Sequence, residues 1–156
     1  MKKILIIFYS RTGVTKKIAE VIKRRLGAES EEIISLKNRQ GAIGYLLSGL
    51  EASRKTLAKI KPAVINPADY DLVIIGTPIW AWNLSSPVRA YLTEQSGKFK
   101  KVAFFCTMGG SGDDKAFAEM EKICGLKPLA TLALTTKKVM TNDYEIEIND
   151  FIVRLR

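Results

Sequence analysis

The sequence predicts an α/β protein with an open, doubly wound parallel sheet and helices on both faces. Apolar runs alternate with segments of helical periodicity along the whole chain. The first of these runs is continuously apolar, as expected for a parallel strand buried on both faces, whereas half-exposed strands alternate apolar with polar residues. With 156 residues the chain has the length of one domain, and we expect that domain to span residues 1–156.

The first part of the chain contains two predicted strands and two predicted helices. Ile4–Tyr9 is interpreted as the first strand, and apolar spacing over 14–26 predicts a helix that ends at Gly27. We expect a second strand at 31–36. The stretch 37–67 is less regular, and we interpret it as containing a helix with a loose, glycine-containing start. Its apolar residues at helical spacing are Ile43, Leu46, Leu47, Leu50, Leu57 and Ile60.

The middle of the chain supplies a third strand, a helix and a fourth strand. The apolar run at 72–75 predicts a buried strand, and 102–106 predicts the next one. Ser86 followed by Pro87 predicts the start of the intervening helix. Ser86 is expected to cap it, and Pro87 is expected in the first turn, where a missing N–H costs nothing.

The last part of the chain completes the alternation. Ser111 and Asp114 have the spacing of a capping box, which predicts the start of a helix that ends at Gly125. A fifth strand is expected at 129–134, and the apolar stripe over 144–155 predicts a terminal helix. Five strands that alternate with helices favour a parallel sheet covered on both faces.

This architecture predicts the position of a functional site before any motif is considered. In open α/β sheets, ligands bind beyond the carboxyl ends of the strands, near the point where the strand order reverses. The segments to inspect are therefore those that follow Tyr9, Gly76 and Cys106, and these are the unusual segments of the sequence.

The first of these loops, Ser10–Thr15, has the chemistry of a phosphate cradle. It leads into the amino end of a helix, where free N–H groups and the helix dipole favour an anion. Ser10, Thr12 and Thr15 add hydroxyl donors, and Gly13 allows close approach of the backbone. The loop has neither the Gly-Lys-Ser/Thr ending of a nucleotide P-loop nor the spaced glycines of a dinucleotide fingerprint. An ordinary capped turn is the alternative interpretation.

The segment Tyr9–Thr15, after an opening apolar strand, resembles the phosphate-loop signature of the flavodoxin family, Ser/Thr-x-Thr-Gly-x-Thr. Val14 stands where the family usually has Asn, which removes one side chain but leaves the backbone donors. The resemblance covers the chain in element order and length. It implies a flavodoxin-like five-stranded sheet with strand order 2-1-3-4-5 and FMN as the phosphate-bearing ligand.

The resemblance assigns the other two loops to the flavin ring. Trp80, with Trp82 second, matches the ring-stacking position, since a flat aromatic side chain suits one face of an isoalloxazine. Asn83 either hydrogen-bonds the flavin or stabilises the turn, and the sequence leaves both open. The glycine-rich third loop lets the backbone approach the ring. The cofactor-binding residues implied are Ser10, Arg11, Thr12, Gly13, Val14, Thr15, Thr77, Pro78, Ile79, Trp80, Ala81, Trp82, Asn83, Thr107, Met108, Gly109, Gly110 and Gly112.

Composition narrows the chemistry further. The chain contains no histidine, which excludes an imidazole-dependent triad and the usual His-ligated metal site, so we expect neither catalytic side chains nor a metal. Cys106 and Cys124 do not make a disulfide framework, and buried small apolar packing is the expected role of both. The short apolar start, without a cleavage site, is expected to be a strand rather than a signal peptide, which favours a cytoplasmic protein without membrane insertion.

The net charge of +9, from 25 Lys and Arg against 16 Asp and Glu, indicates a preference for acidic partners. No nucleic-acid motif accompanies it, so we expect no nucleic-acid binding, and solvated helix faces are the plain alternative. The flavodoxin resemblance implies an electron carrier between redox partner proteins. Two other functions stay open: an NAD(P)H-dependent FMN reductase acting on quinones or other small acceptors, and a flavin-free binding module. The sequence does not determine the oligomeric state.

Overall fold

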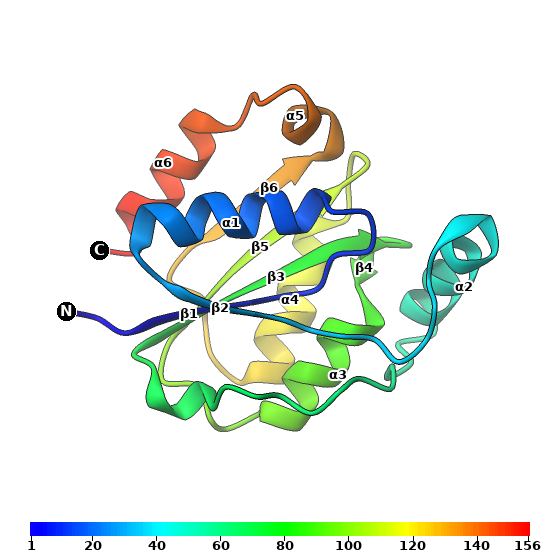
Figure 1. Ribbon diagram of the computed structural model, residues 1–156, viewed down its shortest axis with the longest axis horizontal. Coiled ribbons are helices and arrows are strands. Elements are labelled where there is room, and N and C mark those ends of the chain that lie inside the picture. The colour runs from blue at the N-terminus through cyan, green and yellow to red at the C-terminus, as the bar shows by residue number, and fades with distance from the viewer.

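The computed structural model describes residues 1–156 and contains the predicted parallel sheet, with helices above and below it (Figure 1). The order of the parallel strands is β2-β1-β3-β5-β6. One further short strand, β4, pairs antiparallel with β3 outside this order. Counted along the chain, the five parallel strands have the order 2-1-3-4-5, so the predicted topology is confirmed. The strands are β1 (Ile4–Phe8), β2 (Glu29–Glu32), β3 (Leu72–Trp80), β4 (Asn83–Leu84), β5 (Val102–Met108) and β6 (Thr131–Thr135).

The sheet separates two hydrophobic cores. In β1, Ile6 and Phe8 face the core that α1 and α6 cover, whereas Leu5 and Ile7 face the core that α3 and α4 cover. Because successive strand residues point to opposite faces, a strand covered on both sides is apolar at every position. The helices are α1 (Val14–Leu26), α2 (Gly41–Ser53), α3 (Ser86–Gln95), α4 (Asp113–Cys124), α5 (Thr136–Met140) and α6 (Glu145–Arg154), with a 3₁₀ turn at Pro67–Asp69.

The second strand differs from the prediction. It was expected at 31–36, but the strand is Glu29–Glu32, in register with β1 from Leu5 to Phe8. Ile34 and Leu36 are exposed, and the chain from Ile34 onward pairs instead with the segment around Ile60. β2 is an edge strand made of polar residues. The apolar residues at 33–36 therefore indicated the wrong bounds for this strand.

The irregular stretch 37–67 contains the expected helix, but that helix is shorter than its apolar pattern. α2 ends at Ser53, and Lys55 adopts a left-handed conformation just beyond it, with φ of 55°. Leu57 and Ile60 therefore lie outside the helix. α2 stands beside the carboxyl ends of the central strands rather than on a face of the sheet (Figure 1), and much of its apolar surface is exposed.

Two helix starts also differ from the predictions. Ser86 is the first helical residue of α3, and its hydroxyl bonds to Glu51 instead of capping the helix, although Pro87 does occupy the first turn. The N-cap of α4 is Gly112, and the Ser111 hydroxyl accepts a hydrogen bond from Trp82. In both cases the serine hydroxyl that was predicted to cap the helix bonds instead to a side chain of another element. None of the helices combines the length and apolarity needed to cross a membrane.

Gly76 in β3 provides a test of this packing. A Cβ at Gly76 would lie 2.1 Å from the Phe105 ring, which is fully buried in the core under α1 and α6. We expect Gly76→Ala to lower the free energy of unfolding by about 1–3 kcal/mol because of overpacking. Urea unfolding measures it. Gly49→Ala in α2 is the control: a Cβ there meets nothing within 4 Å, so this variant should match or exceed the parent in stability. Equal stability of the parent and Gly76→Ala would contradict this packing.

Candidate functional site

The three predicted loops meet at one cavity beyond the carboxyl ends of β1, β3 and β5, on the side of the sheet where α2 stands (Figure 1). The cavity has a volume of about 340 Å³. Its lining residues are Arg11, Thr12, Val14, Thr15, Tyr45, Pro78, Ile79, Trp80, Thr107, Met108, Gly109 and Thr136. All but Tyr45 and Thr136 belong to the predicted site, and each of the three loops contributes. The sheet topology therefore brings these distant segments together.

The first loop is organised by the Ser10 hydroxyl. Its Oγ accepts hydrogen bonds from the backbone N–H of Gly13 at 3.1 Å and of Lys16 at 3.2 Å. The N–H groups of Thr12, Val14 and Thr15 have no acceptor within the chain. Gly13 precedes α1 with φ of 92°, a conformation that other residues adopt only with strain. The loop thus presents free donors at a helix amino end, which is the chemistry that a phosphate group requires.

A buried hydrogen bond joins the first loop to the third. Thr15 Oγ1 and Thr107 Oγ1 are 2.8 Å apart, and both side chains are almost fully buried. The third loop is tied in turn to the end of β6, where Thr136 Oγ1 donates to the Met108 carbonyl at 3.2 Å. These bonds fix the relative position of the phosphate-type loop and the glycine-containing loop.

The second loop is a tight hairpin that the sequence analysis missed. β3 continues to Trp80, turns at Ala81 and Trp82, and returns as β4, with Trp80 paired to Asn83. Ala81 and Trp82 have φ of 47° and 59°. Two-residue hairpin turns with positive φ at both central positions usually contain Asn, Asp or Gly there, so Ala-Trp gives no recognisable signal.

The hairpin is supported by the start of α4. Gly112 has φ of 110°, and a Cβ there would lie 2.8 Å from the Cα of Trp82. Trp82 Nε1 also donates to Ser111 Oγ at 3.2 Å. The close backbone approach explains the glycine at this position, and it shows that loops two and three form one packed unit.

The two tryptophans have different environments. Trp80 lines the cavity but is only 7% exposed, and Tyr9 packs edge-on against it with ring centroids 5.5 Å apart. Trp82 is 65% exposed and, with Ala81 and Gly110, borders an adjoining hollow that shares Tyr45 and Ile79 with the cavity. Trp80 thus forms an inner wall, and Trp82 lies at the rim.

The remaining predicted residues lie behind the cavity lining. Asn83 is 1% exposed, and its Oδ1 accepts hydrogen bonds from the backbone N–H of Leu84 and from the Arg89 guanidinium. Of the two roles considered for Asn83, these contacts favour turn stabilisation. Thr77 is buried and bonds to Ser85. These residues, with Ser10, Gly13 and Gly112, shape the loops without lining the main cavity.

Tyr45 and Thr136 are the lining residues that the sequence analysis did not single out. Thr136 follows a predicted strand end, so the reasoning applied to the first loop would have identified it. Tyr45 lies in α2 and carried no such signal. Two contacts hold it beside the cavity. The Arg11 guanidinium stacks on the Tyr45 ring, with Cζ 5.4 Å from the ring centre, and Gln40, at the start of α2, donates to the Arg11 carbonyl at 2.7 Å. These contacts tie α2 to the phosphate-type loop.

The composition of the cavity fits FMN. The free amides of the first loop and the Thr12 hydroxyl are donors that suit a phosphate, and Trp80, Ile79 and Met108 provide apolar surface for a ring system. No Asp, Glu, His or Cys lines this cavity. The lining therefore suits binding and orientation of a cofactor rather than proton transfer by a side chain.

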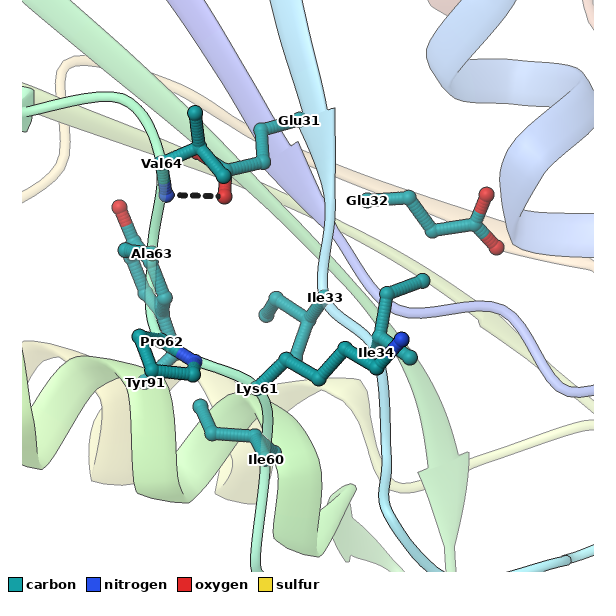
Figure 2. A pocket seen from close by; sticks show the side chains of 10 residues that line it. All are labelled: Glu31, Glu32, Ile33, Ile34, Ile60, Lys61, Pro62, Ala63, Val64 and Tyr91. Atoms are coloured by element: carbon teal, nitrogen blue, oxygen red, sulfur yellow. Dashed lines mark hydrogen bonds between the residues drawn. The ribbon is translucent and has the colours of Figure 1, made fainter.

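A separate cavity of about 190 Å³ lies at the outer edge of the sheet, between β2 and the segment 60–64 (Figure 2). The Glu31 carboxylate accepts hydrogen bonds from the backbone N–H of Val64 and Ile65 and holds that segment to the sheet. This cavity shares no lining residue with the main one.

These features define a doubly wound α/β protein with its ligand cavity at the topological switch between β1 and β3. Residues 3–146 match the family described as Flavodoxin, and the chain belongs to the flavodoxin family. An uncharacterized protein of Archaeoglobus fulgidus is 27% identical over 146 residues, which is 91% of this chain and 92% of that protein.

Two solved structures are similar throughout. A flavoprotein from Lactobacillus acidophilus, determined in complex with FMN, is 26% identical with a TM-score of 0.75, covering 90% of this chain and 98% of that one. A putative flavoprotein from Bacteroides eggerthii is 25% identical with a TM-score of 0.77, covering 94% of this chain and 98% of that one. The family and fold agree with the resemblance found in the sequence.

The two cysteines provide a test of the buried environment in the core. Burial raises the pKa of the Cys124 thiol to about 12, and burial together with the Asp113 charge raises the pKa of Cys106. Both thiols therefore stay protonated in the folded chain at pH values where the unfolded chain loses the protons. Stability should fall as the pH rises above the ordinary thiol pKa, by up to about 1.4 kcal/mol per pH unit for each cysteine.

Urea unfolding between pH 7 and pH 10 measures this slope. A Cys106→Ala/Cys124→Ala variant is the control, because it keeps the other titrating groups and should have a flatter profile. Identical slopes for the variant and the parent would contradict the pKa directions.

Proposed function

We propose that this protein is an FMN-dependent electron carrier that exchanges electrons with other proteins. The observation that supports it best is the convergence of three loops on one cavity whose lining combines free phosphate donors with a buried tryptophan. Membership of the flavodoxin family and the FMN complex of the Lactobacillus acidophilus relative support FMN as the cofactor. The same findings favour the flavin interpretation over a flavin-free binding module.

FMN, when bound, supplies the redox chemistry, and the chain's residues hold and orient it. The free amides of the Ser10–Thr15 loop and the Thr12 hydroxyl would hold the phosphate, and Arg11 would add a positive charge nearby. Trp80 would supply apolar surface for the ring, and the exposed Tyr45 and Trp82 would border it. Their exposure leaves a contact surface at which a partner meets the cofactor.

The basic charge of the chain supports partners with acidic surfaces. The net charge of +9 produces a positive field that attracts acidic proteins and repels basic ones, and salt screens this attraction. A positive field also favours a reduced, anionic flavin over the oxidised one, so the reduction potential would exceed that of a comparable acidic carrier.

A direct NAD(P)H-dependent reductase is the second candidate. A cavity of about 200 Å³ lies between α2 and the hairpin, lined by Tyr45, Leu46, Gly49, Ile79, Trp80 and Ala81. It shares Tyr45, Ile79 and Trp80 with the main cavity, so a small apolar acceptor bound there would lie beside the cofactor.

The phosphate end of the site can be tested by comparing FMN with riboflavin. Charge-assisted hydrogen bonds contribute about 1.5–3 kcal/mol each, so we expect FMN to bind at least roughly a hundredfold more tightly than riboflavin. Thr12→Val should reduce this ratio because it removes one hydroxyl from the loop. Fluorescence titration measures both affinities.

Thr93→Val is the matched control, since its hydroxyl bonds within α3 to the Arg89 carbonyl, away from the loops. It should preserve the ratio. Equal affinities of the unaltered chain for FMN and riboflavin would show that the first loop does not hold the phosphate, and absence of FMN binding would refute the proposed function.

Steady-state NADPH and NADH oxidation separates the two candidates. For a carrier, the purified protein loaded with FMN should consume either nucleotide at the background rate, with or without a quinone, because it needs a separate reductase. Addition of a flavodoxin reductase and NADPH should then reduce the bound flavin. Sustained nucleotide oxidation by the protein alone would favour the reductase.

A further inference from the structure

Arg39 is a buried cation beside the candidate flavin site. It is only 3% exposed, and its guanidinium is surrounded by protein partners. Nη1 lies 2.6 Å from a Glu51 carboxylate oxygen and 3.3 Å from Ser48 Oγ, and Nε donates to Ser35 Oγ at 3.1 Å. A buried charge is costly unless it is paired and hydrogen-bonded, so this position is specifically prepared for an arginine.

The guanidinium also contacts the ring of Trp80. Its Cζ lies 5.5 Å from the centre of the indole, within the range of a cation–π interaction. Trp80 lines both the main cavity and the smaller one under α2, whereas Arg39 lines neither. Arg39 instead borders a separate cavity of about 440 Å³, together with Glu51 and the segment 56–59. It therefore reaches Trp80 from outside the two cavities that the indole lines.

The backbone of Arg39 is fixed as tightly as its side chain. A Cβ at Gly44 would lie 2.3 Å from the Arg39 carbonyl, so α2 packs directly on this residue. The Arg39 carbonyl also accepts a long hydrogen bond from Arg11 of the phosphate-type loop, at 3.5 Å. Arg39 thus connects α2, the first loop and the Trp80 wall.

We propose that Arg39 is a positioning residue that acts through Trp80: it holds the indole in the cavity wall and makes the site bind reduced FMN more tightly, relative to oxidised FMN, than it otherwise would. This inference rests on the proposed function. The effect is transmitted by the indole, because the Glu51 carboxylate at 2.6 Å compensates the direct charge of Arg39. The cation draws electron density from the indole and weakens its attraction for the electron-poor oxidised ring.

The decisive quantity is the ratio of the affinities for oxidised and reduced FMN, which the midpoint potential of the bound cofactor reports. We expect Arg39→Gln to weaken binding of reduced FMN roughly tenfold more than that of oxidised FMN. For a two-electron couple, this lowers the midpoint potential by about 30 mV. Arg39→Lys keeps the charge and should restore most of the ratio, although it loses the planar fork.

Arg25→Gln is the control for the loss of one positive charge. Arg25 pairs with Glu145 near the carboxyl end of α1 and contacts neither Trp80 nor the cavity lining. Its loss should leave the potential near that of the unaltered protein. An equal potential shift in Arg25→Gln would mean that the loss of any ion-paired arginine has this effect, which would overturn the proposal.

A double-mutant cycle tests whether Arg39 acts through the indole. In a Trp80→Leu background, Arg39→Gln should shift the potential by much less than it does in the parent. A shift of the same size in both backgrounds, or no shift in the parent, would overturn the proposal. If Arg39→Gln fails to fold, the same cycle is measured with Arg39→Lys, whose smaller shift should also disappear without Trp80.

Failure of this inference can be distinguished from failure of the proposed function. If the unaltered chain does not retain FMN, the proposed function is refuted and this inference with it. If the unaltered chain retains FMN but the Arg39 variants leave its potential unchanged, the inference alone is refuted.

Discussion

The pairing of β3 with β1 on one side and β5 on the other is the constraint on which the site depends. The register aligns Phe8 of β1 with Gly76 of β3, and Thr77 of β3 with Cys106 of β5. The carboxyl ends of these three strands therefore lie at nearly the same level of the sheet. Because these strands are parallel, the loops that follow them emerge at one edge. Segments separated by more than 60 residues in the sequence thereby become neighbours, and small side chains such as Thr15 and Thr107 suffice to join them.

The loops add strain and polarity that the core could not accept. The sheet interior contains apolar side chains almost exclusively, whereas the free amides of the first loop, the buried Thr15 and Thr107 hydroxyls and the left-handed Ala81–Trp82 turn lie at its carboxyl edge. Such features persist where the surrounding structure determines them, and here the surroundings are the helix starts of α1 and α4. α2, with its glycines and exposed apolar residues, closes this edge rather than a face of the sheet.

Much of the fold could be predicted from the sequence because the central strands are buried on both sides and carry an unambiguous apolar signal. Their carboxyl ends then indicated the site. The remainder depended on tertiary contacts: β2 is a polar edge strand, and Ser86 and Ser111 bond to Glu51 and Trp82 instead of capping helices. The Ala81–Trp82 turn and Tyr45 were missed because neither follows a local rule, and each is held by residues distant in the sequence.

The left-handed Ala81–Trp82 turn has a consequence for motion. Each such non-glycine residue costs about 1–3 kcal/mol, which contacts elsewhere must offset. Here the contacts come from Gly112 and Ser111 at the amino end of α4. If that end of α4 frays, the turn loses its support and relaxes. We therefore expect the hairpin and the first turn of α4 to open together. The rigidity of this part of the cavity wall then depends on the amino end of α4.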